Sequence, residues 1–276
     1  MAYRDILVHV DARTNNLIRL KVAARLARLQ EARLIGLFIR PWQSLPEHLM
    51  LELDSQAVEI QEGFAQSVHT VAETIFRTAA EREGAVSEWR AVDGSLAAML
   101  TLHARYVDLV VLGQRDPDHV STQGERGLIH HLLLETGRPV LVAPYVGRFA
   151  TVGERVLVAW NASRGATRVV HDAIPILVAA RHVQVVTVNP VNGSHGDIPC
   201  ADICHHLARH GVRAEAFALQ AEDMAVGAML LSHAVAEGFD LMVMGAYGHS
   251  RLRGLVTGGV TRHILRHMTL PVLMGR

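Results

Sequence analysis

Short runs of Val, Ile and Leu alternate along the chain with longer segments whose apolar residues recur every three or four positions. Runs such as "RLIGLFI" and "VQVVTV" are apolar on both faces, which is typical of strands in a parallel sheet that helices cover on both sides. The helical pattern at residues 16–30 places four residues on one face, toward the core: Leu17, Leu20, Ala24 and Ala27. The chain is therefore predicted to have an α/β fold.

The pattern occurs twice. "DLVVLG" at 108–113 returns as "DLMVMG" at 240–245, and the same spacing then leads to "RPVLV" at 138–142 and "LPVLM" at 270–274. We therefore expect two tandem Rossmann-like units, each a doubly wound parallel sheet of about five strands. The predicted domains are residues 1–146 and 154–276.

Residues 41–61 interrupt the repeat, because the first unit is longer than the second there. The added length exceeds an ordinary connection between elements of an α/β unit. A lid, a contact surface and a helical extension all remain open.

A glycine-rich stretch follows the strand that ends at Gly245. Ligands of open parallel sheets bind beyond the carboxyl ends of the strands, and glycines let the main chain approach them closely. Amides at the start of the next helix can then bind an anion. The glycines, with arginines between them, favour a phosphate site over a mere tight connection. No lysine or G-x-G-x-x-G pattern accompanies them, so a Walker loop and a standard NAD site are excluded.

At this point the chain resembles the universal stress protein family, whose nucleotide loop reads G-x-x-G-x9-G-[S/T]. Gly245, Gly248 and Gly258 fit that spacing, and Gly259 stands where Ser or Thr is usual. The resemblance covers the whole chain as a tandem of two domains. It implies binding of ATP or a related adenine nucleotide. It also implies an intramolecular pseudo-dimer, with residues 140–143 paired to residues 272–274.

The resemblance assigns the nucleotide to two strand ends, the loop and the start of the last helix: Trp160, Asn161, Thr187, Val188, Gly245, Gly248, His249, Arg251, Gly258, Gly259, Val260 and Thr261. Two positions depart from the family pattern. Gly259 lacks a hydroxyl, for which Thr257 or Thr261 could substitute. Asn161 replaces the usual Asp and is a poorer ligand for an accompanying Mg²⁺. We therefore expect ATP binding with at most weak hydrolysis, and assign no catalytic or metal-binding residue.

The first unit keeps a family-like Asp11 but lacks the glycine loop, since Asp116 aligns with Gly248 and Arg126 with Gly258. At a separation of ~4 Å and an effective dielectric constant of about 20, Asp116 would repel a phosphate charge by about 4 kcal/mol. A helix N-terminus offers only about 0.3–1 kcal/mol in return. We therefore predict a degenerate site in the first unit.

Lys plus Arg equals Asp plus Glu, at 27 each, so no net charge draws the chain to nucleic acid or to a membrane. No apolar run is long enough to span a membrane, and the N-terminus enters a strand without a secretory signal. Cys200 and Cys204 are interpreted as ordinary thiols of a reducing cytoplasm.

Two histidine pairs have helical spacing that can bind a metal, His206 with His210 and His263 with His267. No third ligand converges on either pair in the sequence. We interpret them as surface or capping residues.

The sequence thus predicts a cytoplasmic stress-response protein that binds one adenine nucleotide in its second domain and acts as a nucleotide-dependent sensor or interaction module. A second copy of the chain or another protein is the expected partner. Two alternatives stay open: a slow ATPase or nucleotidyl-transfer enzyme, and a structural module without a ligand.

Overall fold

The computed structural model describes residues 2–12, 16–40, 55–117, 127–190, 200–222, 224–247 and 259–276, with the side chains of residues 55–61 left out. The first half contains β1 (Asp5–Val10), α1 (Asn16–Leu29), β2 (Arg33–Arg40), α3 (Ser55–Glu83), β3 (Ser87–Asp93), α4 (Leu96–Ala104), β4 (Leu109–Gly113), α5 (Leu128–Glu135) and β5 (Val140–Ala143). The second half contains β6 (Arg155–Ala159), α6 (Arg164–Ala179), β7 (His182–Val188), α7 (Ala201–Arg209), β8 (Ala214–Leu219), α8 (Val226–Ala236), β9 (Leu241–Gly245), α9 (Gly259–His267) and β10 (Val272–Gly275).

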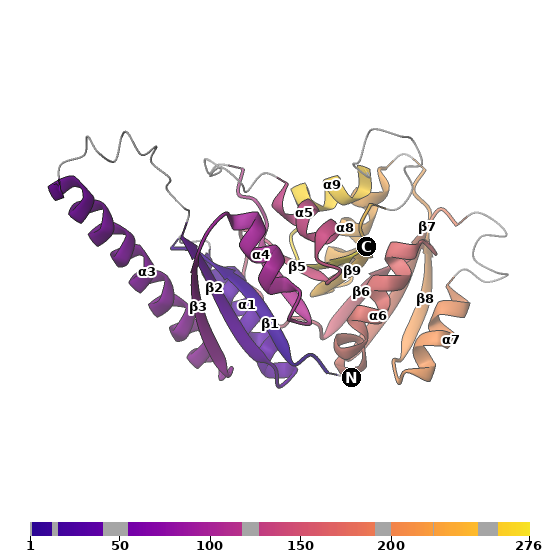
Figure 1. Ribbon diagram of the computed structural model, residues 1–276. Helices are drawn as coiled ribbons and strands as arrows, with labels where there is room; N and C mark the ends of the chain where they lie inside the picture. The colour runs from indigo at the N-terminus through magenta and orange to yellow at the C-terminus, as the bar shows by residue number, and fades with distance from the viewer. Residues whose placement is uncertain are drawn as a thin grey trace.

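The strands form one 10-stranded sheet in the order β3-β2-β1-β4-β5-β10-β9-β6-β7-β8, which runs through the whole molecule (Figure 1). Within each half all neighbouring strands are parallel. The halves meet where β5 and β10 pair antiparallel, with Leu273 opposite Leu141. The predicted fold, two doubly wound units joined through their last strands as an intramolecular pseudo-dimer, is confirmed. The predicted domain limits at residues 146 and 154 fall between β5 and β6.

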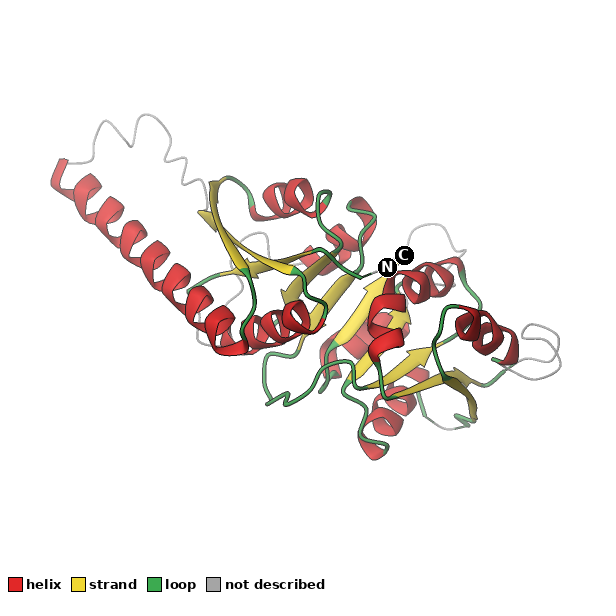
Figure 2. Cartoon of the chain, turned by 90° about the horizontal axis from the view of Figure 1, so that it is seen from below, coloured by secondary structure: helices red, strands yellow, loops and turns green. Residues whose placement is uncertain are grey.

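Helices cover both faces of this sheet (Figure 2). Along β1, Ile6 and Val8 pack on the side of α1, α3, α6 and α7, whereas Leu7 packs on the side of α4, α5, α8 and α9. All three side chains are fully buried. This two-sided burial is the physical reason that successive residues of the central strands are apolar.

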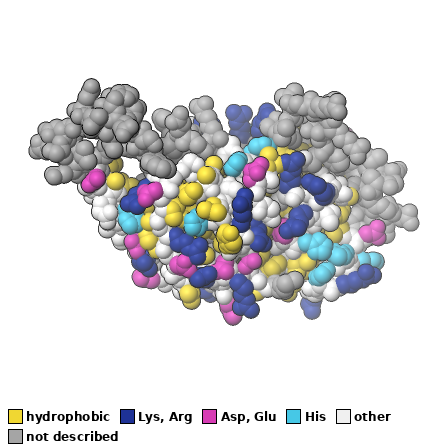
Figure 3. Space-filling model, in the orientation of Figure 1, with side chains coloured by type: hydrophobic (Ala, Val, Ile, Leu, Met, Phe, Trp, Pro, Cys, Tyr) yellow, Lys and Arg dark blue, Asp and Glu magenta, His cyan; other side chains and the backbone are white. Residues whose placement is uncertain are grey.

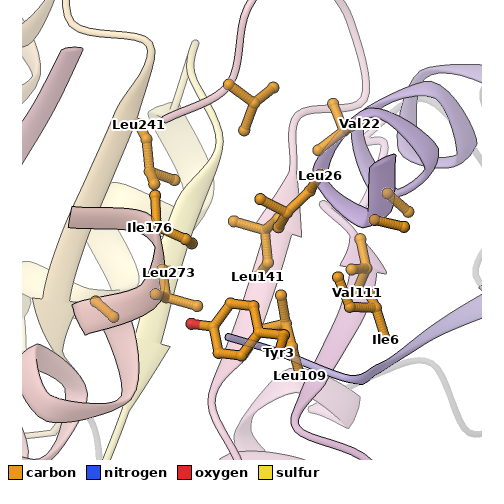
Figure 4. Close-up of a cluster of buried hydrophobic side chains, with 14 of the residues drawn as sticks. Tyr3, Ile6, Val22, Leu26, Leu109, Val111, Leu141, Ile176, Leu241 and Leu273 are labelled. Atoms are coloured by element: carbon orange, nitrogen blue, oxygen red, sulfur yellow. The ribbon is translucent and has the colours of Figure 1, made fainter. Parts of the chain in front are cut away.

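The hydrophobic core continues across the seam between the halves. Leu141 on β5 and Leu273 on β10 belong to one buried cluster, which also takes in Ile176 of the second half (Figure 4). Tyr3, at the start of the first half, donates its hydroxyl to the main-chain oxygen of Asp172 on α6. Burial raises the pKa of Tyr3 far above its ordinary value. The two halves therefore share a core.

The aspartate of each repeated motif anchors the first strand of its own half. The Asp108 carboxylate accepts hydrogen bonds from the amides of residues 4 and 5. Asp240 accepts from the amides of residues 153–155. The two halves thus repeat the aspartate that anchors the first strand as well as the hydrophobic pattern of the strands.

One core prediction is wrong. Leu17 is 39% exposed, although Leu20, Ala24 and Ala27 are buried as expected. The helix begins only at Asn16, so Leu17 lies in its first turn and lines an open groove beside α3 instead of the sheet.

Part of the extra segment is helical, since α3 begins at Ser55 and is 29 residues long. Its N-terminal end projects past the sheet (Figure 1). Residues 41–54 lie outside the described part of the chain.

Candidate functional site

A cavity of about 360 Å³ opens at the carboxyl ends of β6, β7 and β9, beside the first residues of α9. This is the edge at which open parallel sheets bind their ligands. The described residues that line it are Ala159, Trp160, Asn161, Val186, Val188, Val226, Leu230, Met244, Gly245, Gly259, Val260 and Thr261.

The structure brings together most of the site residues that it describes. Those that line the cavity are Trp160, Asn161, Val188, Gly245, Gly259, Val260 and Thr261. Thr187 does not line it and is only 2% exposed, because successive residues of β7 point to opposite faces of the sheet. Gly248, His249, Arg251 and Gly258 lie outside the described residues.

Sequence reasoning missed the apolar part of the lining. Val186 could have been found, since it is two residues before Val188 on the same face of β7. Val226 and Leu230 come from α8, whose sequence carries no motif that connects it to the loop. Apolar lining of this kind is normal for small-molecule sites.

Asn161 is placed by the turn that leads into α6. Its side-chain oxygen accepts from the amide of Ser163 at 3.2 Å. Ser163 in turn caps α6 by accepting from the amide of Ala166 at 3.2 Å. The side-chain oxygen of Asn161 therefore serves the turn. This leaves its NH₂ group as the better-suited contact for a ligand and supports the prediction that Asn161 is a poor ligand for Mg²⁺.

The two cavity glycines have different reasons to be glycine. A Cβ atom at Gly245 would lie 2.5 Å from the main-chain nitrogen of Ala166, so this position must be bare for β9 to pack against α6. Among the described residues, a Cβ atom at Gly259 would meet nothing within 4 Å. Of the two glycines, Gly259 is thus the one with room beside it in the described part of the chain, at the N-terminus of α9, where a helix dipole favours an anion.

Tyr247 holds the start of the glycine-rich loop. Its amide donates to the hydroxyl of Thr261 at 3.2 Å, and its φ angle of 57° is in the left-handed region. Thr261 lines the cavity and is 3% exposed, and its contact with a ligand stays a prediction. Burial raises the pKa of Tyr247, while the positive charges of Arg276 and Arg262 lower it. Two arginines therefore lie near this loop.

In the first half an arginine lies beside the end of β1. Arg19 is 8% exposed and pairs with Asp11 at 3.1 Å. A Cβ atom at Gly113, the counterpart of Gly245, would lie 3.1 Å from the Arg19 guanidinium. The side chain of Arg19 thus lies where the main chain of α6 packs in the second half. Its pairing with Asp11 balances the charge of the carboxylate at this strand end, and the degenerate site of the first half stays a prediction. Arg126 lies outside the described residues.

The structure adds a third histidine to one predicted pair. The ring centroid of His171 on α6 is 5.1 Å from that of His206 and 5.9 Å from that of His210. Figure 3 shows histidine side chains gathered between α6 and α7. Even so, within the described ranges no group of three or more His, Cys, Asp or Glu is placed to hold a metal ion.

The two cysteines are free thiols on and beside α7. Burial, with a smaller contribution from Cys204, raises the pKa of Cys200 to about 12. Such a thiol stays protonated and unreactive at neutral pH. No helix in the described ranges has both the length and the apolar character needed to cross a membrane.

Residues 206–276 match the sequence model of the universal stress protein family. A universal stress protein of Synechocystis sp. (strain PCC 6803) is 30% identical over 179 residues, which are 61% of this chain and 58% of the relative. The chain therefore spans little more than half the length of this curated relative.

Solved structures share the fold over the whole chain. A universal stress protein from Archaeoglobus fulgidus DSM 4304 superposes with a TM-score of 0.71 at 15% identity, covering 99% of this chain and 98% of that one. A functionally unknown protein from Pseudomonas aeruginosa PAO1 has a TM-score of 0.58 at 17% identity, covering 99% and 92%. At such low identity these likenesses show the fold alone.

Proposed function

We propose that the chain, whose residues 206–276 match the universal stress protein family, binds one adenine nucleotide, ATP foremost, in its second half. The nucleotide acts as a signal that alters the conformation or the association of the protein. The observation that carries the proposal is the cavity at the ends of β6, β7 and β9, which opens onto bare main chain at Gly259.

The cavity has an apolar end that suits a purine ring and a second end, at the start of α9, that suits phosphates. Val186, Val188 and Leu230 form an apolar wall suited to a purine ring, and Trp160 lies at the edge of the same wall. Phosphates suit the N-terminus of α9, where Gly259 leaves room for them. The volume of about 360 Å³ falls within the usual range for small-molecule sites.

Binding is better supported than turnover. The described lining residues include no Asp, Glu, His, Lys or Arg. A phosphoryl-transfer site needs positioned charges and a ligand for Mg²⁺, and Asn161 is a weak substitute for a carboxylate. We therefore propose a nucleotide-dependent module whose ATP hydrolysis is slow or absent.

The test exploits the open space at Gly259. Gly259→Asp and Gly259→Asn add side chains of nearly the same size, but only Asp brings a negative charge to the phosphates. We expect calorimetry to show one ATP per chain for the parent, an affinity within about threefold for Asn, and a loss of about tenfold or more for Asp. The melting temperature of the Asp variant should not fall, because Asp is favourable at a helix N-terminus.

The first half supplies the stoichiometry control. Arg19→Gln should leave one ATP per chain, and a change in stoichiometry would show that the first crevice is a working site. Equal losses from Asp and Asn at Gly259 would contradict phosphate binding there. No heat and no thermal shift with ATP would favour a structural module, and rapid formation of ADP would favour the enzyme.

A further inference from the structure

A second cavity, of about 710 Å³, lies between α1 and α3 in the first half. Residues 147–150, in the link between the halves, close a third side. We call this the α1–α3 groove. Figure 2 shows α3 running alongside α1. The groove shares no lining residue with the candidate nucleotide cavity, so the proposed function does not account for it.

The floor of the α1–α3 groove is apolar. It includes Leu17, which is 39% exposed, and Ile75 and Phe149, which are partly buried against the core. An apolar surface that is concave and open is more typical of a binding site than are single exposed side chains. Ile18, the next residue of α1, also lines the groove and is partly exposed.

One wall of the groove is fixed in place by Arg25. This residue pairs with Glu83 on α3 at 2.8 Å and also donates to the main-chain oxygens of Phe149 and Ala150. The link between the halves is thereby tied to both helices. The charges of Arg25 and Glu83 neutralise each other, so neither supplies a free charge to the groove.

The remaining charges that line the groove are all positive. Lys21, Arg82 and Arg148 are exposed, and within the described part of the chain none of their side chains makes a hydrogen bond or an ion pair. Three cations thus surround an apolar floor without a protein anion to balance them. A ligand that matches this pattern carries one negative group at the end of an apolar body.

We propose that the α1–α3 groove binds a free fatty acid, with its alkyl chain on Leu17, Ile75 and Phe149 and its carboxylate at Lys21 and the rim arginines. The volume of about 710 Å³ is within the range of ligand sites. The corresponding helix of the second half, α7, has 9 residues against 29 in α3.

The first experiment compares head groups on one chain length. Dodecanoate, below its micelle concentration, is titrated into the full chain by calorimetry, and dodecyltrimethylammonium is titrated in parallel. We expect one dodecanoate per chain and an affinity at least about tenfold weaker for the cationic compound, since the rim is positive. Equal affinities would overturn the proposal, because they would show non-specific apolar binding.

Lys21 provides a second readout, because it is the only lysine in the sequence. Acylation of its amine by an amine-reactive ester, followed by peptide mass analysis, should slow at least about threefold when dodecanoate is bound. The chain's α-amino group serves as the unprotected reference in the same sample. Unchanged labelling of Lys21 under saturating dodecanoate would place the ligand elsewhere and overturn the assignment.

Variants locate the ligand. Lys21→Glu should weaken dodecanoate binding about tenfold or more, whereas Arg213→Glu, an exposed arginine of the second half, should change it less than twofold. Leu17→Asn should weaken binding without lowering the melting temperature by more than a few degrees. Equal effects of Lys21→Glu and Arg213→Glu would mean attraction by overall charge alone and would contradict a site.

The groove proposal and the nucleotide proposal can be tested independently of each other. Saturating ATP, or the Gly259→Asp variant, should leave dodecanoate binding unaltered. If ATP displaces dodecanoate, the fatty acid occupies the nucleotide cavity and the groove proposal is wrong. Binding to anionic phospholipid vesicles without binding to free dodecanoate would assign the surface to a membrane instead and would also overturn it.

Discussion

Gly245 and Gly259 show that neighbouring glycines of one motif can serve different physical needs. Gly245 is required by packing, because a Cβ atom there would lie 2.5 Å from the backbone of α6. Gly259 has no described neighbour within 4 Å of an added Cβ atom. A side chain at the first position must push two elements apart, whereas at the second it enters only the cavity.

We therefore expect Gly245→Ala to lower the free energy of unfolding by about 1–3 kcal/mol, in the range of overpacked cores. Gly259→Ala should leave the free energy unchanged or raise it by up to about 1 kcal/mol, because alanine is the better helix former. Urea denaturation followed by circular dichroism measures both. Similar losses in the two variants would contradict the close contact with α6.

At the scale of single residues, the sequence predicted positions better than side-chain directions. The strand end that carries Thr187 and Val188 was located correctly, but only Val188 faces the cavity, because the direction depends on which face of the sheet holds the ligand. The position of Arg19 beside Asp11 could not have been predicted. Its pairing with Asp11 joins the end of a strand to a helix, and no local pattern encodes that contact.

At the scale of elements, α6 and α7 are joined by a histidine cluster, His171, His206 and His210. The Nε2 atom of His206 is buried and has no hydrogen-bond partner among the described residues. Burial lowers the pKa of His206, and the neighbouring His171, His210 and Arg209 lower it further. In the folded protein the imidazole therefore resists protonation.

This cluster predicts a pH dependence with a definite sign. A folded-state pKa below the unfolded value means that the unfolded chain binds the proton first, so stability falls as the pH drops through the ordinary histidine range near 6.5. His206→Gln should lose less stability than the parent between pH 7.5 and pH 5.5, as measured by thermal unfolding at both values. His263→Gln, in the pair on α9, is the matched control. A parallel fall in the parent and in His206→Gln would contradict the assignment.

The order and type of the elements followed from the sequence because local pattern and tertiary role agree there. "DLVVLG" and "DLMVMG" became β4 and β9, each preceded by an anchoring aspartate. The groove between α1 and α3 did not follow. The groove depends on how far α1 lies from the 29-residue helix α3 and from the link between the halves. Hydrophobic periodicity predicts the type of an element, but it does not predict the distance between elements.

At the scale of the whole molecule, the shared core makes the two halves one folding unit. Leu273→Ala, at the fully buried seam, should lower the free energy of unfolding by about 2–5 kcal/mol. Hydrogen exchange should then speed up in β1 and β6 alike, because the two strands belong to halves that unfold together. Leu102→Ala, at a leucine that is 45% exposed, should change stability by less than about 0.5 kcal/mol. Faster exchange in β6 alone would indicate two independent halves.

The seam also limits how a second copy could bind. Both β5 and β10 already have a strand on each side. The expected homodimer therefore cannot use these strands and must use another surface, with β3 and β8 as the outer strands of the sheet.

Because β5 and β10 lie on one polypeptide, their encounter does not depend on how much of the protein a cell makes, and dilution cannot separate them. The two paired strands also have different sequences, so a substitution in one half does not appear in the other half. A duplicated sequence joined in this way can lack the glycine loop in one half while the other half keeps it.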